Sequence, residues 1–161
     1  MTLFIKNLLF TLLVPGTVAV VIPITISQDI SLSVGLMTLI GFILWLFGLI
    51  IYIYSVWGFA IWGKGTPAPV DAPKHLVIRG LYQYMRNPMY IGVLSILLGW
   101  TCLYNSLGLW VYWFFMACCF QLFILYYEEP KLLQLFGSEY KVYCSAVNRW
   151  LPKWPLAKVH D

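Results

Sequence analysis

Four long apolar runs without a charged residue limit what this chain can fold into more than any other feature. They cover residues 8–26, 33–62, 89–103 and 107–127. A helix that crosses a bilayer needs about 20 consecutive apolar residues. Only 10% of this chain is charged, whereas a soluble domain has about 25%. The runs therefore predict an all-α integral membrane protein with about four transmembrane helices, folded as a single domain over residues 1–161.

The length and the prolines of each run predict the shape of the helix that it forms. Pro15 and Pro23 interrupt the first run, which is too long for a signal core and should form a kinked membrane helix. The second run would form a helix about 45 Å long, so it should tilt or protrude from a hydrocarbon core of roughly 30 Å. Only residues 104–106 separate the last two runs, which predicts a tight helical hairpin. The third run is short for a full span.

The basic residues indicate which side of the membrane each connection occupies. The two connections at residues 28–32 and 104–106 contain none. Because basic residues favour the cytoplasmic side, both termini and the loop of residues 63–88 are predicted to be cytoplasmic. With four spans, all ten basic residues lie in the N-terminus, in this loop or in the C-terminal segment of residues 128–161: Lys6, Lys64, Lys74, Arg79, Arg86, Lys131, Lys141, Arg149, Lys153 and Lys158.

Several functional classes do not fit this pattern. No Asp, Glu, Lys, Arg or His lies deep within a run, which argues against an ion channel or a proton pump. No basic stretch suggests a nucleic-acid partner. Cys102, Cys118, Cys119 and Cys144 show no CxxC spacing and are interpreted as small hydrophobic residues, so neither a metal site nor a disulfide is expected. Function should therefore lie at the cytoplasmic face.

The loop between the second and third runs is dense in polar and aromatic side chains. Glycine and proline between Gly63 and Pro73 preclude a long helix there. Asn87 is predicted to cap the third helix, with Pro88 in its first turn. A plain connector would not need the following residues so close together: His75, Arg79, Tyr82, Tyr84, Arg86, Asn87 and Tyr90.

The segment after the fourth run forms the second informative part of the chain. Glu128 and Glu129 adjoin the end of that run, where two acids could bind a cation. The cation could be a basic side chain of the loop or a positively charged ligand. Four residues that follow at helical spacing predict an amphipathic helix at the cytoplasmic surface: Leu132, Leu133, Leu135 and Phe136.

Two blocks of these segments carry a family resemblance: RGLYQYMRNPMYIG at residues 79–92 and YEEPKLLQLFGSEYKVYCSAVNRWLP at residues 127–152. They resemble the isoprenylcysteine carboxyl methyltransferase and phospholipid methyltransferase superfamily. Its members typically show Gly-x-Tyr…Arg-His-Pro-x-Tyr, an acidic pair, Leu…Phe-Gly-x-x-Tyr-x-x-Tyr and a final Arg. The resemblance implies a membrane enzyme that transfers a methyl group from S-adenosylmethionine (AdoMet). Its acceptor would be lipid-like or prenylated, with a carboxylate or an amine to be methylated.

The resemblance also implies a cytoplasmic AdoMet pocket formed by the loop, the end of the hairpin and the C-terminal segment. Glu128 and Glu129 would bind the ribose hydroxyls or the amino group, whereas no catalytic residue is assigned and no metal is expected. Carried over by position, the candidate cofactor-binding residues are Lys74, His75, Leu76, Val77, Gly80, Tyr82, Arg86, Asn87, Pro88, Met89, Tyr90, Glu128, Glu129, Tyr140 and Arg149.

Two positions depart from the family pattern, and two other functional classes stay open. Asn87 stands where many members have His, and Asn can still donate and accept hydrogen bonds. Ile124 stands where prenylcysteine-methylating members carry an Arg that is associated with substrate binding, which puts a carboxylate held by that Arg in doubt. The alternatives are an NADPH-dependent membrane reductase of the sterol-reductase type and a non-catalytic membrane scaffold.

Overall fold

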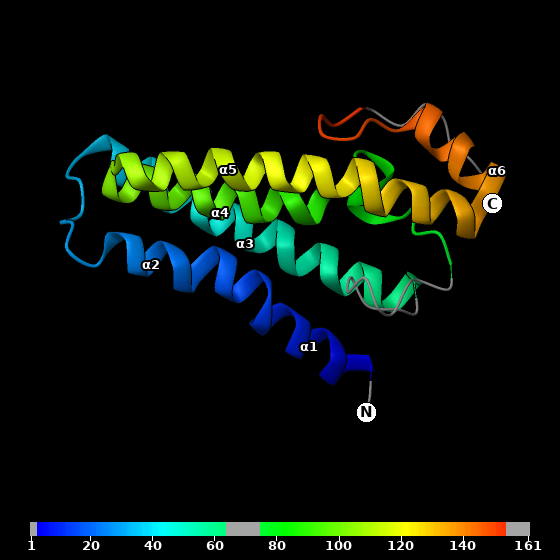
Figure 1. The fold of residues 1–161 in the computed structure, drawn as a ribbon, viewed down its shortest axis with the longest axis horizontal. Coiled ribbons are helices and arrows are strands. Elements are labelled where there is room, and N and C mark those ends of the chain that lie inside the picture. The colour runs from blue at the N-terminus through cyan, green and yellow to red at the C-terminus, as the bar shows by residue number, and fades with distance from the viewer. Residues whose placement is uncertain (1–2, 64–74, 154–161) are drawn as a thin grey trace.

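The computed structural model describes residues 3–63 and 75–153, which form helices and contain no strand (Figure 1). The helix boundaries lie within a few residues of the predicted runs. In chain order the elements are α1 (Leu3–Leu13), η1 (Thr17–Val21), α2 (Ile22–Ser27), α3 (Leu36–Gly63), η2 (Gly80–Gln83), α4 (Pro88–Tyr104), α5 (Leu107–Phe123), η3 (Ile124–Glu128) and α6 (Glu129–Ala146).

The first apolar run is bent, as its prolines predict (Figure 1). Helix α1 ends two residues before Pro15, and the chain continues into α2 through the π-helical turn η1. Pro23 has no N–H, so it supplies no backbone donor to the carbonyls four and five positions before it, those of Ala19 and Val18. Side chains replace it: Tyr112 Oη donates to the Val18 carbonyl at 3.0 Å, and Trp100 Nε1 donates to the Ala19 carbonyl at 2.8 Å.

Helices α3 and α4 approach each other closely at two pairs of glycines. A Cβ atom on Gly48 would lie 2.5 Å from the carbonyl oxygen of Gly92, and one on Gly41 would lie 2.9 Å from that of Gly99. Small residues at such interfaces let helix backbones approach within membranes. Gly41, Gly48, Gly92 and Gly99 therefore let the backbones of α3 and α4 pack directly against each other.

A tight turn joins α4 to α5, as the short spacing between the last two runs predicts. Asn105 adopts the left-handed conformation with φ 46°, and its N–H donates to the Thr101 carbonyl at 2.7 Å. Trp113 Nε1 of α5 donates to the Leu94 carbonyl of α4 at 3.1 Å. The connection from α2 reaches the same end, where the Ser33 N–H donates to the Leu103 carbonyl at 2.8 Å.

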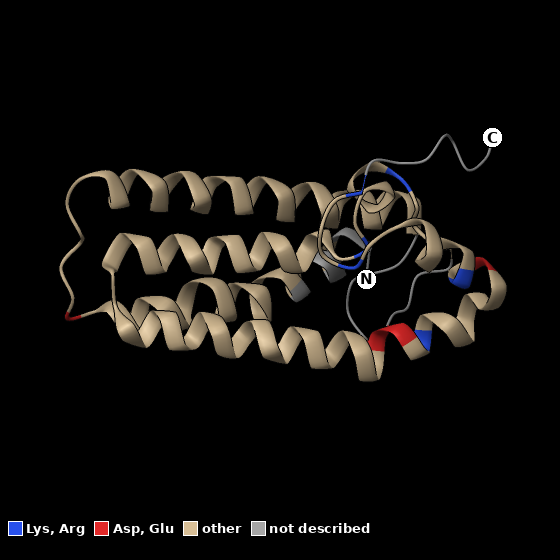
Figure 2. Cartoon of the chain, turned by 90° about the horizontal axis from the view of Figure 1, so that it is seen from above, with Lys and Arg blue, Asp and Glu red and all other residues tan. Residues whose placement is uncertain are grey.

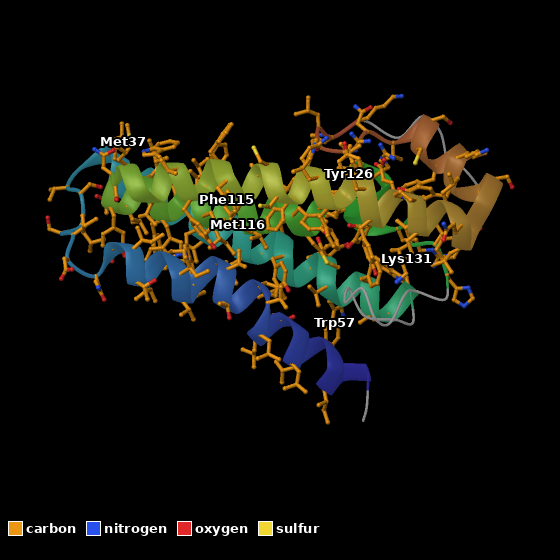
Figure 3. The ribbon with its side chains drawn as sticks, viewed as in Figure 1. Met37, Trp57, Phe115, Met116, Tyr126 and Lys131 are labelled. Carbon is orange, nitrogen blue, oxygen red and sulfur yellow. The ribbon has the colours of Figure 1, made fainter. Side chains whose placement is uncertain are left out.

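The outer faces of the bundle are apolar. Met37, Trp57 and Phe115 are exposed and distributed along the length of the bundle (Figure 3). Helix α3 and the helical stretch Leu107–Ala146 are long and apolar enough to cross a membrane, with only 17% and 11% of their most apolar windows buried. A soluble protein would bury such faces, so the chain is a membrane protein. The apolar segments Thr11–Ser27 and Pro88–Tyr104 are shorter.

The described Lys and Arg residues gather at one end of the bundle (Figure 2). That end contains the loop of residues 75–87, helix α6 and the segment that follows it. The opposite end carries the connection of residues 28–35, with the acidic Asp29, and the α4–α5 turn. The basic residues, which the sequence assigns to one set of connections, therefore also lie together in the folded chain.

Helix α6 begins without a break from α5 and η3, rather than as a separate helix. Pro130 therefore lies inside a continuous helical stretch, shortly after the π-helical turn η3. The reversal comes at Gly137, whose φ of 52° and ψ of −120° are not helical, and the second half of α6 turns back over the bundle end (Figure 1). Leu132 and Phe136 pack there against Tyr140 and Tyr143. The location of α6 at a membrane surface stays a prediction.

Candidate functional site

The loop before α4 and the chain after α6 lie side by side, although more than sixty positions separate them. We call residues 147–153 the tail segment. Met85 forms an isolated parallel bridge with Asn148, and the Arg86 N–H donates to the Asn148 carbonyl at 2.9 Å. The Lys153 N–H donates to the Tyr84 carbonyl, also at 2.9 Å. Tyr143 of α6 adds a bond of 2.6 Å from its hydroxyl to the Tyr82 carbonyl.

A small cavity of about 40 Å³ lies where the loop meets η3 and α6. This volume holds only a few water molecules. Its lining combines charged, amide and phenol groups with apolar side chains: Phe59, Leu76, Val77, Tyr82, Arg86, Asn87, Glu128, Glu129, Leu132, Tyr140 and Tyr143.

Glu129 is bound by two arginines from separate parts of the chain. Arg149 of the tail segment donates from Nε and Nη2 to the two carboxylate oxygens, each at 2.9 Å. Arg86 of the loop lies 3.1 Å from Oε1 through Nη1, which also donates to the Cys144 sulfur at 2.6 Å. Such paired, charge-assisted bonds are the stronger kind of hydrogen bond. The sequence leaves two cationic partners open for the acidic pair, a basic side chain of the loop or a charged ligand. At Glu129 the structure shows the first of these, Arg86.

Glu128 lies in a different environment. It is partly buried, and its Oε2 accepts a hydrogen bond of 2.7 Å from Tyr90 Oη. In the part of the chain that the structure describes, no Lys or Arg forms an ion pair with Glu128. Burying a carboxylate without a cation is costly, so this side chain is suited to a positively charged ligand.

A larger cavity of about 450 Å³ adjoins the small one. The two share five lining residues: Phe59, Tyr82, Arg86, Asn87 and Glu128. The volume falls within the range of roughly 300–1,000 Å³ that is usual for ligand pockets. Its other walls are mostly apolar and come from four helical segments: Val14, Pro15, Val18, Tyr52, Met89, Tyr90, Val93, Cys119, Phe120 and Phe123.

The protonation states of two groups at this end follow from their surroundings. Burial raises the pKa of the Tyr82 hydroxyl, and the nearby charge of Glu128 raises it further. Hydrogen bonding to Glu129 raises the pKa of the Arg149 guanidinium, against the opposing effect of its partial burial. At neutral pH Tyr82 is therefore a neutral hydrogen-bonding group, and Arg149 is a cation.

The structure brings most of the candidate residues together at the two cavities. Leu76, Val77 and Tyr140 line the small cavity, and Met89 and Tyr90 line the large one. Gly80, with a φ of 61°, lies against Trp62, and Pro88 is buried in the first turn of α4. His75 is exposed and lines neither cavity, and Lys74 falls outside the described residues. Arg149 lines neither cavity and is bonded to two residues that do, Glu129 and Asn87.

Asn87 corrects one local expectation. It occupies the N-cap position of α4, but its side chain makes no capping hydrogen bond. Instead Nδ2 donates to the Arg149 carbonyl at 3.2 Å, because the tail segment lies against this residue. The amide is 6% exposed and lines both cavities. Asn87 therefore joins the loop, the tail segment and the cavities.

Sequence reasoning missed the residues that η1, the short stretch before it and α5 contribute to the large cavity. Phe59 of α3, which lines both cavities, was missed as well. Their apolar side chains look like ordinary membrane-facing residues in the sequence. Tyr52 carries the one available signal, a hydroxyl within an apolar run; it donates to Thr11 Oγ1 at 3.2 Å. The tail block of residues 127–152 also contains Tyr143, which lines the small cavity although it is not among the candidate residues.

Together these features define a class of helical membrane proteins that have an apolar exterior and charge-lined cavities at one end of the bundle. The family described as phospholipid methyltransferase matches residues 36–139, which is more than half of the chain. The chain therefore belongs to the phospholipid methyltransferase family, which confirms the predicted superfamily and classes the protein as a membrane methyltransferase. No curated protein and no solved structure gives a significant match.

The residues that match the family, 36–139, include only part of the candidate site. The matched range contains the loop, Tyr90 and both glutamates, because it runs from the start of α3 to Glu139. The segments α1, η1 and α2 lie outside it, as do Tyr140 and Arg149. The family match therefore supports the acidic pair and the loop more directly than the tail segment.

Proposed function

We propose that this protein transfers the methyl group of AdoMet to a lipid-like or prenylated acceptor at the cytoplasmic face of a membrane. The family supports methyl transfer. The observation that carries the proposal is Glu128, a partly buried carboxylate without a basic partner among the described residues, where the two cavities meet. AdoMet is a cation at its sulfonium, and such a carboxylate favours a cation in a site of low polarity.

The side chains around the cavities fit the amino-acid end of AdoMet. That end carries an ammonium group beside the sulfonium, both suited to Glu128, and a carboxylate. Arg86 lines both cavities, and its Nε is buried with no hydrogen-bond partner in the described structure. This donor is suited to the carboxylate, while Tyr82 and Asn87 offer further polar contacts.

When bound, AdoMet supplies a methyl carbon that is already activated by its positive sulfur. The residues of the chain then have to align the acceptor with that carbon and keep water out. Tyr90 fixes the Glu128 carboxylate through its hydrogen bond of 2.7 Å. Phe59 and Phe120 contribute apolar walls that exclude water. A carboxylate acceptor needs no general base, whereas an amine would first have to lose a proton, and no residue is assigned to that task.

The large cavity is proposed to hold the apolar part of the acceptor. Its walls come from the first helical segment, α3, α4 and α5, so an acceptor could reach it sideways from the bilayer. Ile124, at the position where prenylcysteine-methylating members carry an Arg, is 1% exposed and apolar. That position therefore supplies no cation for an acceptor carboxylate, and the acceptor could be a carboxylate or an amine.

We further propose that the chain crosses the membrane four times, with both termini cytoplasmic. The connection of residues 28–35 would then face the opposite side, away from the basic end. In intact cells, an impermeant maleimide should label an Asp29→Cys variant, whereas a Lys141→Cys variant should react only after permeabilisation. The wild type gives the background from the native cysteines. Labelling of both variants in intact cells would contradict this topology.

Calorimetric titration of the purified protein tests the proposed function directly. We expect saturable binding of AdoMet and of S-adenosylhomocysteine, and no binding of NADPH. Binding of NADPH alone would support a reductase instead. If none of the three ligands bound, in detergent and again in lipid nanodiscs, a scaffold would be the better interpretation.

A further inference from the structure

The tail segment touches the small cavity only indirectly. None of residues 147–153 lines either cavity. Three residues that do line the small cavity are nevertheless bonded to the tail segment. The Arg86 N–H donates to the Asn148 carbonyl at 2.9 Å, Asn87 Nδ2 donates to the Arg149 carbonyl at 3.2 Å, and Glu129 accepts both bonds from the Arg149 side chain.

The paired bonds between Arg149 and Glu129 are the strongest of these connections. Arg149 is charged, and a guanidinium that meets a carboxylate through two parallel N–H groups gains geometric specificity as well as energy. Two further contacts fix the segment: the Lys153 N–H on the Tyr84 carbonyl at 2.9 Å and Trp150 Nε1 on Gln121 Oε1 at 2.7 Å. The remaining hydrogen bonds between the tail segment and the loop use backbone atoms of the tail segment: the carbonyls of Asn148 and Arg149 and the N–H of Lys153.

We propose that Arg149 is a positioning residue of the methyl-transfer site. Through Glu129 it holds the tail segment against the loop, and thereby places Arg86, Asn87 and Glu129 around the small cavity without contacting the ligand itself. This rests on the proposed AdoMet site for its functional consequence, although its structural part stands independently. It assigns Glu128 and Glu129 different tasks: Glu128 faces the ligand, whereas Glu129 holds two arginines.

Hydrogen exchange measured by mass spectrometry tests, without any ligand, whether Arg149 holds the tail segment against the loop. In Arg149→Gln and in Glu129→Gln, we expect the Arg86 and Lys153 amides to exchange at least about tenfold faster, because the segment that protects them is released. The double variant should exchange no faster than either single variant, since the two side chains act as one unit. Glu128→Gln, the matched control on the neighbouring acid, should leave this exchange at the wild-type rate.

Titration with AdoMet tests whether this positioning affects ligand binding. Both single variants should bind AdoMet roughly tenfold or more weakly, while their midpoint of thermal unfolding stays within a few degrees of the wild type. Arg149→Lys should restore part of the affinity, because it keeps the charge but not the paired geometry. A purely structural role predicts instead that affinity falls only where the unfolding midpoint falls.

The outcomes separate this proposal from the proposed function. Wild-type exchange rates in Arg149→Gln, or additive effects in the double variant, would overturn the positioning role even if AdoMet binds. Weaker AdoMet binding by Glu129→Gln with unchanged exchange would also overturn it, because Glu129 would then contact the ligand directly. If the wild type does not bind AdoMet, the proposed function fails, and the exchange rates still decide whether Arg149 holds the tail segment.

Discussion

Glu128→Gln should remove most of the affinity for AdoMet and leave the protein at least as stable as the wild type. The amide keeps the size of the side chain and can still accept the bond from Tyr90 Oη. It lacks the negative charge, and a hydrogen bond to a charged group contributes about 1.5–3 kcal/mol, which corresponds to a loss of roughly 10- to 150-fold in affinity. Stability should not fall, because the variant removes a buried charge that has no basic partner among the described residues.

Calorimetry and thermal unfolding of the same preparation check both halves of this expectation. Glu139→Gln is the matched control, since Glu139 is exposed on the second half of α6 and lines neither cavity. Its affinity and its unfolding midpoint should equal those of the wild type. Wild-type affinity in Glu128→Gln would remove the main support for the proposed cofactor site.

Gly48→Ala should destabilise the bundle more than any other single methyl group added at the glycines of α3 and α4. The new Cβ would lie 2.5 Å from the Gly92 carbonyl oxygen and 2.7 Å from the Ile96 backbone nitrogen, so the two helices must separate. Overpacking of this kind costs about 1–3 kcal/mol. The loss would exceed the gain of about 1 kcal/mol that Ala has over Gly within a helix.

Gly108→Ala provides the control for this prediction. The same substitution in the first turn of α5 would place a Cβ 3.2 Å from Ile26 Cγ2 and 3.6 Å from Ser106 Oγ, contacts that small side-chain shifts relieve. In detergent, thermal unfolding followed by circular dichroism should show a clearly lower midpoint for Gly48→Ala and almost none of this change for Gly108→Ala. Equal midpoints for the two variants would contradict the close approach of α3 and α4.

The helices were predictable because their signals are local. Apolar runs place α3, α4 and α5 within a few residues, and the short spacing at residues 104–106 leaves room only for a turn. Pro15 predicts the bend in the first helix for the same reason. The α5–α6 continuity was not predictable, since Glu128 and Glu129 look like the polar end of a helix although nothing there breaks it before Gly137.

The site was predictable in composition but not in the roles of its members. Glu128 and Glu129 are neighbours in the sequence, which therefore predicts the same role for both. In a helix, however, consecutive side chains point about 100° apart, so Glu128 meets Tyr90 whereas Glu129 meets Arg86 and Arg149. The sequence predicts that Asn87 caps α4, because the first turn of that helix is its nearest partner along the chain. In the structure its side chain instead donates to the Arg149 carbonyl, 62 positions away.

The carbonyls of Val18 and Ala19 bear on how the protein is made. Their side-chain donors, Tyr112 and Trp100, follow them by 94 and 81 positions, so the ribosome produces the acceptors long before the donors. An unpaired carbonyl in lipid costs several kcal/mol. The helical segment that contains Val18 and Ala19 therefore completes its hydrogen bonds only after α4 and α5 have been made, and a nascent chain that ends before α5 would expose a defect to membrane quality control.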